Sequence, residues 1–216
     1  MTEHRAAILG RLSKALDHIT DADAIAGRLA AHPRGPQPQW PETLRERFLA
    51  KLAKGAGSCA EIGAPADIAR AVGDYLAAQN LPPRLVAAPH PLLDGVAWPQ
   101  GWQVEQRRAG GDDRIGLVAA FCGVAESGGL VLLSGPDSPT SLNFLPDDFL
   151  CLLPADRIVP RMEDAWDLLR RERGTPPRAI NFVSGPSRTA DVEQTIQLGA
   201  HGPRRLHVLL LGEGPG

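Results

Sequence analysis

A glycine-rich turn carries one acidic side chain between two strongly apolar segments. Glu126 lies in the sequence Ala-Glu-Ser-Gly-Gly at residues 125–129, directly after an apolar stretch. A carboxylate at such a turn can act as a nucleophile or a general base, and it can equally be a solvated turn residue. Rigid flanking strands favour the functional interpretation, because catalytic groups concentrate on turns that a scaffold holds in place. Glu126 is therefore the candidate catalytic residue.

Ser127, the next residue, does not fit the nucleophile elbow of a serine hydrolase. In that motif, a Gly-x-Ser-x-Gly turn leads from a strand into a helix. Here Ala125 replaces the first glycine, and residues 129–134 predict a strand after the turn. The sequence gives no support to a Ser-His-Asp hydrolase.

Two apolar segments of the chain end in the same sequence, Ser-Gly-Pro. The first reaches it at Ser134 and the second at Ser184. Proline holds the residue before it extended, so the chain leaves each strand in a defined direction. If the two strands run parallel, both loops open at one edge of a sheet and can line one site. The alternative is that Ser-Gly-Pro simply ends a strand well.

The loop after the second segment has the composition of an anion-binding site. Its hydroxyl residues can cap a helix predicted over residues 190–197, and the free amides of a helix N-terminus attract anions. An arginine there suits a carboxylate or a phosphate, although a capped helix with a solvated arginine explains the same residues. The candidate binding residues are Ser184, Gly185, Ser187, Arg188, Thr189 and Asp191, together with His201, a lone histidine of a kind that is more often structural.

The charge of the chain argues against a nucleic-acid partner. The 216 residues include 23 Lys and Arg against 25 Asp and Glu, for a net charge of −2. A broad nucleic-acid footprint would need a clustered excess of Lys and Arg. We therefore expect no nucleic-acid binding.

Cofactor motifs are missing from the sequence. The three cysteines are widely spaced, so they predict neither a disulfide framework nor a four-cysteine iron–sulfur cluster within this chain. There is no Walker loop, no dinucleotide-binding glycine motif after a strand and no His-Glu-x-x-His. We expect no cofactor and no metal within this chain, and we expect the cysteines to be small buried side chains.

The N-terminal sequence is polar and shows no secretory signal. The longest apolar runs, residues 117–125 and 206–211, are too short to span a bilayer as a helix. The expected location is the cytoplasm, with no membrane segment.

Apolar periodicity predicts helices in the first part of the chain and alternating strands and helices afterwards. A proline-rich linker over residues 32–38 follows two predicted helices, of which the second covers residues 22–31. The apolar faces are Ile8, Leu12, Leu16 and Ile19 in the first helix, and Leu44, Phe48 and Leu52 in a helix after Pro41.

The alternation after residue 58 predicts a three-layer α/β/α fold with a mixed, mostly parallel sheet and an N-terminal helical extension. The short gap at residues 126–128 favours a hairpin, and ligands of such sheets bind beyond the carboxyl ends of the strands. Predicted strands are 59–62, 85–87, one around 102–105, 115–125, 129–134, 150–154, 179–184 and 206–211, and predicted helices are 65–79, 160–171 and 190–197.

Several segments resemble, in order and spacing, the signature of the lactate-utilisation (LUD) domain family. Residues 123–129, Gly-Val-Ala-Glu-Ser-Gly-Gly, resemble its Gly-(Ile/Val)-Ala-Glu-Thr-Gly-Thr strand, although Ser127 and Gly129 replace threonines. Residues 155–160 resemble its next landmark, and residues 184–193 and 198–203 its carboxy-terminal signature. The resemblance divides the chain into an N-terminal helical region, 1–57, and a LUD α/β domain, 58–212.

The resemblance implies a fold similar to the sugar-isomerase and coenzyme-A-transferase-like proteins. It also implies an accessory subunit of a complex that oxidises L-lactate to pyruvate, with iron–sulfur clusters in partner subunits and a small carboxylate as a ligand. Glu126 is similar to the thioester-attacking glutamate of coenzyme-A transferases, although only Glu-x-Gly is shared. The alternative is a stand-alone enzyme or an anion-sensing module for an acyl or phosphorylated metabolite, acting through Glu126 and residues 187–191. Whether the chain is an enzyme stays open.

Overall fold

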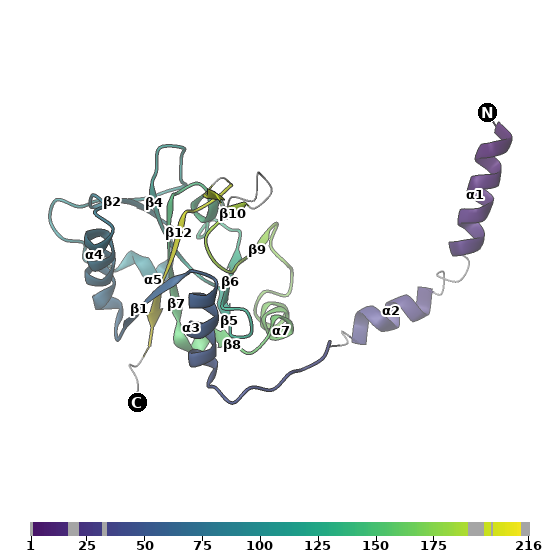
Figure 1. Cartoon of the computed structure of the whole chain (residues 1–216), viewed down its shortest axis with the longest axis horizontal. Coiled ribbons are helices and arrows are strands. Elements are labelled where there is room, and N and C mark those ends of the chain that lie inside the picture. The colour runs from purple at the N-terminus through teal and green to yellow at the C-terminus, as the bar shows by residue number, and fades with distance from the viewer. Residues whose placement is uncertain (1, 17–21, 32–33, 190–196, 200, 213–216) are drawn as a thin grey trace. The chain divides into compact units, whose positions relative to one another are not determined.

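Short apolar strands and amphipathic helices alternate from residue 58 onward, and the computed structural model of the chain arranges them around two main sheets (Figure 1). The structure describes residues 2–16, 22–31, 34–189, 197–199 and 201–212. The chain forms two compact units, Met1–Trp40 and Pro41–Gly216.

The first unit contains the two predicted N-terminal helices, α1 (Thr2–Leu16) and α2 (Ala22–Ala31). Their apolar side chains are exposed: Ile8 is 59% and Leu12 is 52% accessible. Ile19, which was predicted on the same face, lies outside the described residues. Because these apolar side chains are exposed, burial of apolar surface contributes little to the stability of the two helices.

Helix α3 (Leu44–Lys54) belongs to the second unit and supplies part of its core. Thr43 and Glu46 begin it with a capping box, in which each side chain accepts a hydrogen bond from the other's backbone amide. Phe48 and Leu52, one turn apart, are 0% and 1% exposed, as the sequence predicted. The second compact unit begins at Pro41, before α3. The predicted division of the chain into an N-terminal region, 1–57, and a LUD domain, 58–212, stays a prediction.

The larger sheet has six strands in the order β1-β12-β7-β4-β2-β3, and every neighbouring pair is parallel. This confirms the predicted mixed α/β fold with a mostly parallel sheet. Helices and the second sheet cover its two faces, so its central strands are almost wholly buried, and the polar residues of β7 and β12 lie toward their amino ends. The strands are β1 (Ser58–Ile62), β2 (Arg84–Ala87), β3 (Gln103–Gln106), β4 (Ile115–Ala119), β7 (Asp148–Pro154) and β12 (Arg205–Leu211).

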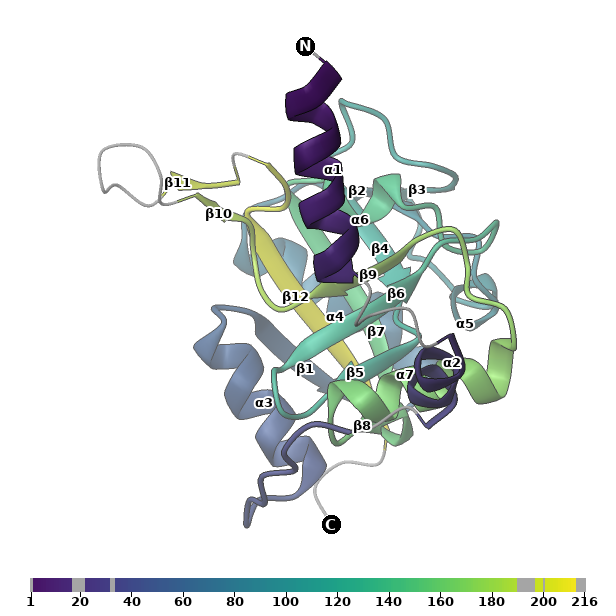
Figure 2. The ribbon, with the colours of Figure 1, turned by 90° about the vertical axis from the view of Figure 1, so that its right-hand side faces the viewer.

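The smaller sheet has four strands in the order β8-β5-β6-β9 (Figure 2). Its strands are β5 (Cys122–Val124), β6 (Gly129–Leu133), β8 (Ile158–Val159) and β9 (Ile180–Val183). The predicted hairpin is confirmed, because β5 and β6 pair antiparallel. Alternate side chains of β6 enter different cores: Leu130 and Leu132 pack with the larger sheet, and Val131 and Leu133 with α7 (Met162–Arg173).

The single strand predicted over residues 115–125 is wrong, because the chain passes there from one sheet to the other. Ala120 donates its backbone N–H to Leu152 of the larger sheet, whereas Phe121 donates to Val131 of the smaller one. Both strands are buried on both faces, so no polar residue marks the crossing.

The remaining elements are short or cover the sheets. The predicted helices over 65–79 and 160–171 are confirmed with slightly different ends, whereas the helix predicted over 190–197 lies outside the described residues up to 196, and Gln197 is in a strand. These elements are η1 (Pro65–Asp67), α4 (Ile68–Ala78), α5 (Pro91–Asp94), α6 (Ser141–Phe144), η2 (Ala155–Arg157), β10 (Arg188–Thr189) and β11 (Gln197–Leu198).

A buried carboxylate joins the amino ends of the central strands to α4. Asp148 is 0% exposed and accepts hydrogen bonds from the Tyr75 hydroxyl, at 2.6 Å, and from the Arg205 guanidinium, at 2.7 Å to Oδ2. These bonds raise the pKa of Arg205, and burial together with Asp148 raises the pKa of Tyr75. The ring of Tyr75 stacks on His207, whose pKa burial lowers to about 4.

Loss of the counter-charge of Asp148 should destabilise the fold strongly. Arg205→Ala leaves a buried carboxylate with only a hydroxyl donor, and we expect the free energy of unfolding in urea to fall by about 2–4 kcal/mol. The expected loss lies toward the lower end of the range for broken buried ion pairs, because the Arg205 side chain is 43% exposed. Arg204→Ala is the control: its ion pair with Asp147 is exposed, and its loss should cost below about 1 kcal/mol. Equal effects of the two variants would contradict this role for Asp148.

Candidate functional site

A cleft of about 580 Å³ opens where several strands end at their carboxyl side. Its walls include Ala119 at the end of β4, Leu133 at the end of β6 and Pro154 at the end of β7. This is the edge at which open α/β sheets bind ligands. The volume falls within the range of about 300–1,000 Å³ that is typical of small-molecule sites.

The first Ser-Gly-Pro loop forms one side of the cleft and is held to the neighbouring chain. Ser134 donates its backbone N–H to the Ala179 carbonyl at 2.9 Å, and its Oγ accepts the Ala179 N–H at 2.8 Å. Gly135 and Ser138 exchange two backbone hydrogen bonds that close the turn. The loop therefore offers a preorganised wall.

Arg157 forms another wall, but its guanidinium is already occupied. It binds Glu172 through two hydrogen bonds of 2.6 and 2.9 Å, and its Nε donates to the Phe121 carbonyl at 3.0 Å. The guanidinium also lies 4.9 Å above the centre of the Phe121 ring. The paired bonds raise the pKa of Arg157 and lower that of Glu172.

His90 stands at the cleft with a fixed ring tautomer. Its Nδ1 accepts the backbone N–H of Leu92 at 3.2 Å and caps α5, so the hydrogen of the neutral ring is assigned to Nε2. Burial lowers the pKa of His90, the charges of Asp137 and Asp94 oppose this shift, and Arg173 adds to it. His90, Asp137 and Arg173 come from three separate segments that meet at the cleft.

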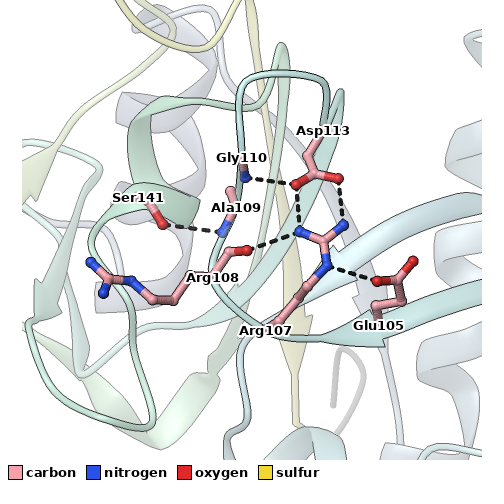
Figure 3. A network of polar contacts seen from close by, with 7 residues as sticks. All are labelled: Glu105, Arg107, Arg108, Ala109, Gly110, Asp113 and Ser141. Atoms are coloured by element: carbon pink, nitrogen blue, oxygen red, sulfur yellow. Dashed lines mark hydrogen bonds and ion pairs between the residues drawn. The ribbon is translucent and has the colours of Figure 1, made fainter.

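A second hollow, of about 380 Å³, lies mainly at the amino ends of β2 and β4 and has a self-contained polar wall (Figure 3). Arg107 binds Asp113 at 2.6 and 2.8 Å, Glu105 at 2.7 Å and the Arg108 carbonyl at 2.9 Å. These contacts order the loop before β4 and leave the Arg107 guanidinium satisfied within the protein. This hollow is therefore the weaker candidate.

Glu126, the predicted catalytic residue, lies at the opposite end of the β5–β6 hairpin from the cleft. Its Oε1 accepts the backbone N–H of Met162, the first residue of α7, at 3.0 Å, and its own N–H donates to the Pro160 carbonyl at 3.1 Å. A carboxylate at a helix N-terminus stabilises the helix. The geometry thus gives Glu126 a structural task, and its catalytic role stays a prediction.

The two Ser-Gly-Pro loops do not share an edge. Strand β9 pairs antiparallel with β6, with Val183 opposite Leu130 and Ile180 opposite Leu133. Ser184 therefore leaves the sheet beside Gly129, at the end away from the cleft. The parallel arrangement that would have joined the two loops in one site is wrong.

The second loop packs instead against the carboxyl end of α3. Arg188 donates to the Gly55 carbonyl at 3.2 Å, and Gly185, with φ of +135°, lies so close to Gly55 that a Cβ atom would collide with its carbonyl. Gly128, in the turn of Glu126, would likewise collide with Leu52. The structure thus brings the turn of Glu126 and the Ser184–Arg188 residues together around the end of α3.

The rest of the predicted anion loop has a different local structure from that expected. Arg188 and Thr189 form β10, paired with β11. The helix that Ser187 or Thr189 was predicted to cap would begin at residue 190, outside the described residues, so the capping stays a prediction. The backbone N–H of Ser187 donates to the Pro203 carbonyl, and the Ser187 carbonyl accepts the N–H of Gly199. His201 is exposed. Asp191 lies outside the described residues. Anion binding at Ser184, Gly185, Ser187, Arg188, Thr189, Asp191 and His201 stays a prediction.

Metal and membrane sites find little support in the part of the chain that the structure describes. Within it, no three His, Cys, Asp or Glu side chains gather in a way that could hold a metal ion. Cys122 and Cys151 are buried and Cys59 is half-buried, and burial raises the pKa of all three thiols. None of the described helices has the length and apolarity needed to cross a membrane.

Most of the cleft residues were not among those predicted as functional from sequence. His90 and Arg173 lie in segments without a motif, whereas Asp137 directly follows the first Ser-Gly-Pro sequence, which was considered as a possible wall of a site. Arg157 lies in the segment 155–160, which resembles a family landmark, and that resemblance was the available signal.

Comparison with known proteins identifies the family. The LUD domain matches residues 93–211, more than half of the chain. The chain belongs to the LUD domain family. The LUD match covers both the cleft loop at Ser134 and the turn of Glu126, so both ends of the hairpin lie within the family domain.

Two similar proteins share the name lactate utilization protein C. The one from Anoxybacillus flavithermus is 40% identical over 89 residues, which is 41% of this chain and 40% of that protein. The one from Bacillus subtilis is 35% identical over 102 residues, covering 46% and 42%. This LUD chain thus spans about two fifths of the length of the curated relatives it matches.

A solved structure shows the same fold. The crystal structure of a DUF162 family protein from Deinococcus radiodurans at 1.70 Å resolution superposes with a TM-score of 0.59. It covers 81% of this LUD chain and 100% of its own, at 18% sequence identity. At that identity the likeness concerns the fold alone.

Removal of the Glu126 carboxylate should weaken the beginning of α7. We expect Glu126→Ala to lower the free energy of unfolding by about 1 kcal/mol, as for loss of a helix cap. Glu126→Gln keeps an acceptor oxygen and should lose less. Urea unfolding followed by circular dichroism measures both. If Glu126→Ala is as stable as the wild type, the capping role is wrong.

The titration of His90 should report the charges of the cleft. Its pKa, measured by NMR from the ring Cε1 proton, should lie below the ordinary value of about 6.5, because burial disfavours the charged ring. Arg173→Ala should raise this pKa by removing a positive charge, and Asp137→Asn should lower it further. A wild-type pKa at or above the ordinary value would contradict the described geometry.

Proposed function

We propose that this LUD chain is a subunit of a cytoplasmic lactate-utilisation system and works beside iron–sulfur subunits that oxidise L-lactate to pyruvate. The observation that carries the proposal is family membership, together with relatives named lactate utilization protein C over the matched region. The proposed role is accessory: the chain binds a ligand or a partner, and partner subunits carry the redox centres.

Two further observations support an accessory role. Three widely spaced cysteines cannot supply the four thiolates of a cluster within this chain. The three thiols are buried or half-buried, and burial raises the pKa of Cys59 to about 11 and that of Cys122 to about 12, as expected of small side chains packed in a core.

The cleft favours a second candidate, a small-molecule enzyme or sensor. A preformed hollow with three convergent charged or polar groups is the default place for a ligand in an α/β protein. This candidate requires saturable binding by the purified chain alone, which an accessory subunit that only contacts protein would not show.

Deletion of the gene tests the lactate-utilisation proposal. We expect lactate-dependent dye reduction in extracts of the native host to be lost in the deletion strain and restored by the gene supplied elsewhere in the genome. Glu126→Gln and Arg188→Ala are the variants to complement with, because they address the predicted catalytic and anion-binding residues.

Immunoblots of the iron–sulfur subunits provide the control for polar effects on neighbouring genes. A tagged version of the chain, purified from the host, should bring its iron–sulfur partner subunits with it, so the preparation should contain iron and acid-labile sulfide. Lactate-dependent dye reduction that is unchanged in the deletion strain would refute the proposal.

A further inference from the structure

We propose that the 580 Å³ cleft binds an organic monocarboxylate whose apolar body is several carbons long. The carboxylate would pair with Arg173, and the body would lie on the apolar floor formed by the strand ends. The proposal rests on the cleft alone and does not depend on lactate oxidation.

Arg173 is the cation that the cleft leaves for a ligand. Of the two guanidinium groups that line it, Arg157 is satisfied by Glu172 and the Phe121 carbonyl. The side chain of Arg173 makes no hydrogen bond or ion pair with the described residues. It lies at the last residue of α7, on the rim of the cleft, where a planar guanidinium can take both oxygens of a carboxylate.

Hydroxyl and ring donors around the cleft complete a site for an anion. The Oγ of Ser138 is buried and has no hydrogen-bond partner among the described residues, and buried hydroxyls ordinarily have one. The Ser134 Oγ accepts the Ala179 N–H, so its own hydrogen is left to donate. The neutral His90 ring presents Nε2–H, since Nδ1 is the acceptor for Leu92.

The charges of the cleft favour a ligand with a single negative charge. Arg157 and Glu172 neutralise each other, which leaves the separate charges of Arg173 and Asp137. Arg173 can pair with one carboxylate, whereas a phosphate with two negative charges would be repelled more strongly by Asp137 and would find no second unpaired cation among the described cleft residues. Asp137 would accept a hydrogen bond from a 2-hydroxyl group on the same ligand.

The size and floor of the cleft require more than a three-carbon acid. Leu92, Ala119, Phe121 and Leu133 are among the apolar residues that line it. Volumes of this order take ligands that are larger than lactate. A three-carbon acid would leave most of the apolar floor in water, and a longer body would cover it.

A homologous series of acids tests the proposal on the purified full chain. Binding of propanoate, butanoate, pentanoate and hexanoate, measured by ligand-detected NMR, should tighten about fourfold per methylene, the equivalent of about 0.8 kcal/mol for each buried CH₂. 1-Hexanol and hexyl phosphate should bind more weakly than hexanoate. 2-Hydroxyhexanoate should bind more tightly than hexanoate, and Asp137→Ala, which removes the acceptor oxygens, should remove that difference.

Matched variants separate the site from nonspecific binding. Arg173→Ala should weaken hexanoate at least tenfold, whereas Arg171→Ala, whose side chain does not line the cleft, should leave it unchanged. Ser138→Ala removes a hydroxyl that the fold does not use and should also weaken binding. The proposal is overturned by the lack of saturable binding, by affinity independent of chain length, by tighter binding of hexyl phosphate, or by equal binding in Arg173→Ala. A negative result here leaves the gene-deletion experiment unaffected, so the two proposals can fail separately.

Discussion

The hairpin of β5 and β6 has no solvent-facing side, and the arrangement of the rest of the α/β unit depends on this constraint. One face of β6 packs with the larger sheet and the other with α7, so both faces must be apolar. Chemistry can therefore take place only at the ends of the hairpin. One end opens into the cleft beside Leu133, and the other closes onto the carboxyl end of α3 beside Gly128.

The closed end shows that one set of residue types can serve either a site or the packing of the backbone. Glu126, Gly128 and Gly185 have the residue types expected of a reactive turn and an anion loop, yet the described contacts are those of close backbone packing and helix capping. A glycine that permits two backbones to approach and a glycine that permits a ligand to approach are indistinguishable in one sequence. Arg188, which binds the Gly55 carbonyl, shows the same ambiguity for a cation.

Local patterns predicted most elements, and the errors arise where non-local pairing decides the structure. The spacing of Phe48 and Leu52 was sufficient for α3, and the short turn at 126–128 for the hairpin. The break between Ala119 and Cys122 was not predictable, because both strands are buried and equally apolar. The direction of β9 relative to β6 depends on pairing across about fifty residues, and it decided that the two Ser-Gly-Pro loops lie apart. The cleft residues come from segments that only the fold brings together.

The strand order also constrains the sequence of events during synthesis. Strand β12 lies between β1 and β7, although it follows both in the chain, with Ser58 opposite His207. Until residues 205–211 leave the ribosome, β1 has no neighbour and one edge of β7 is unpaired. Exposed edges of apolar strands invite association with other chains, and such long-range pairing slows folding. The two edges that β12 covers therefore stay open to other chains until residues 205–211 are available to pair with them.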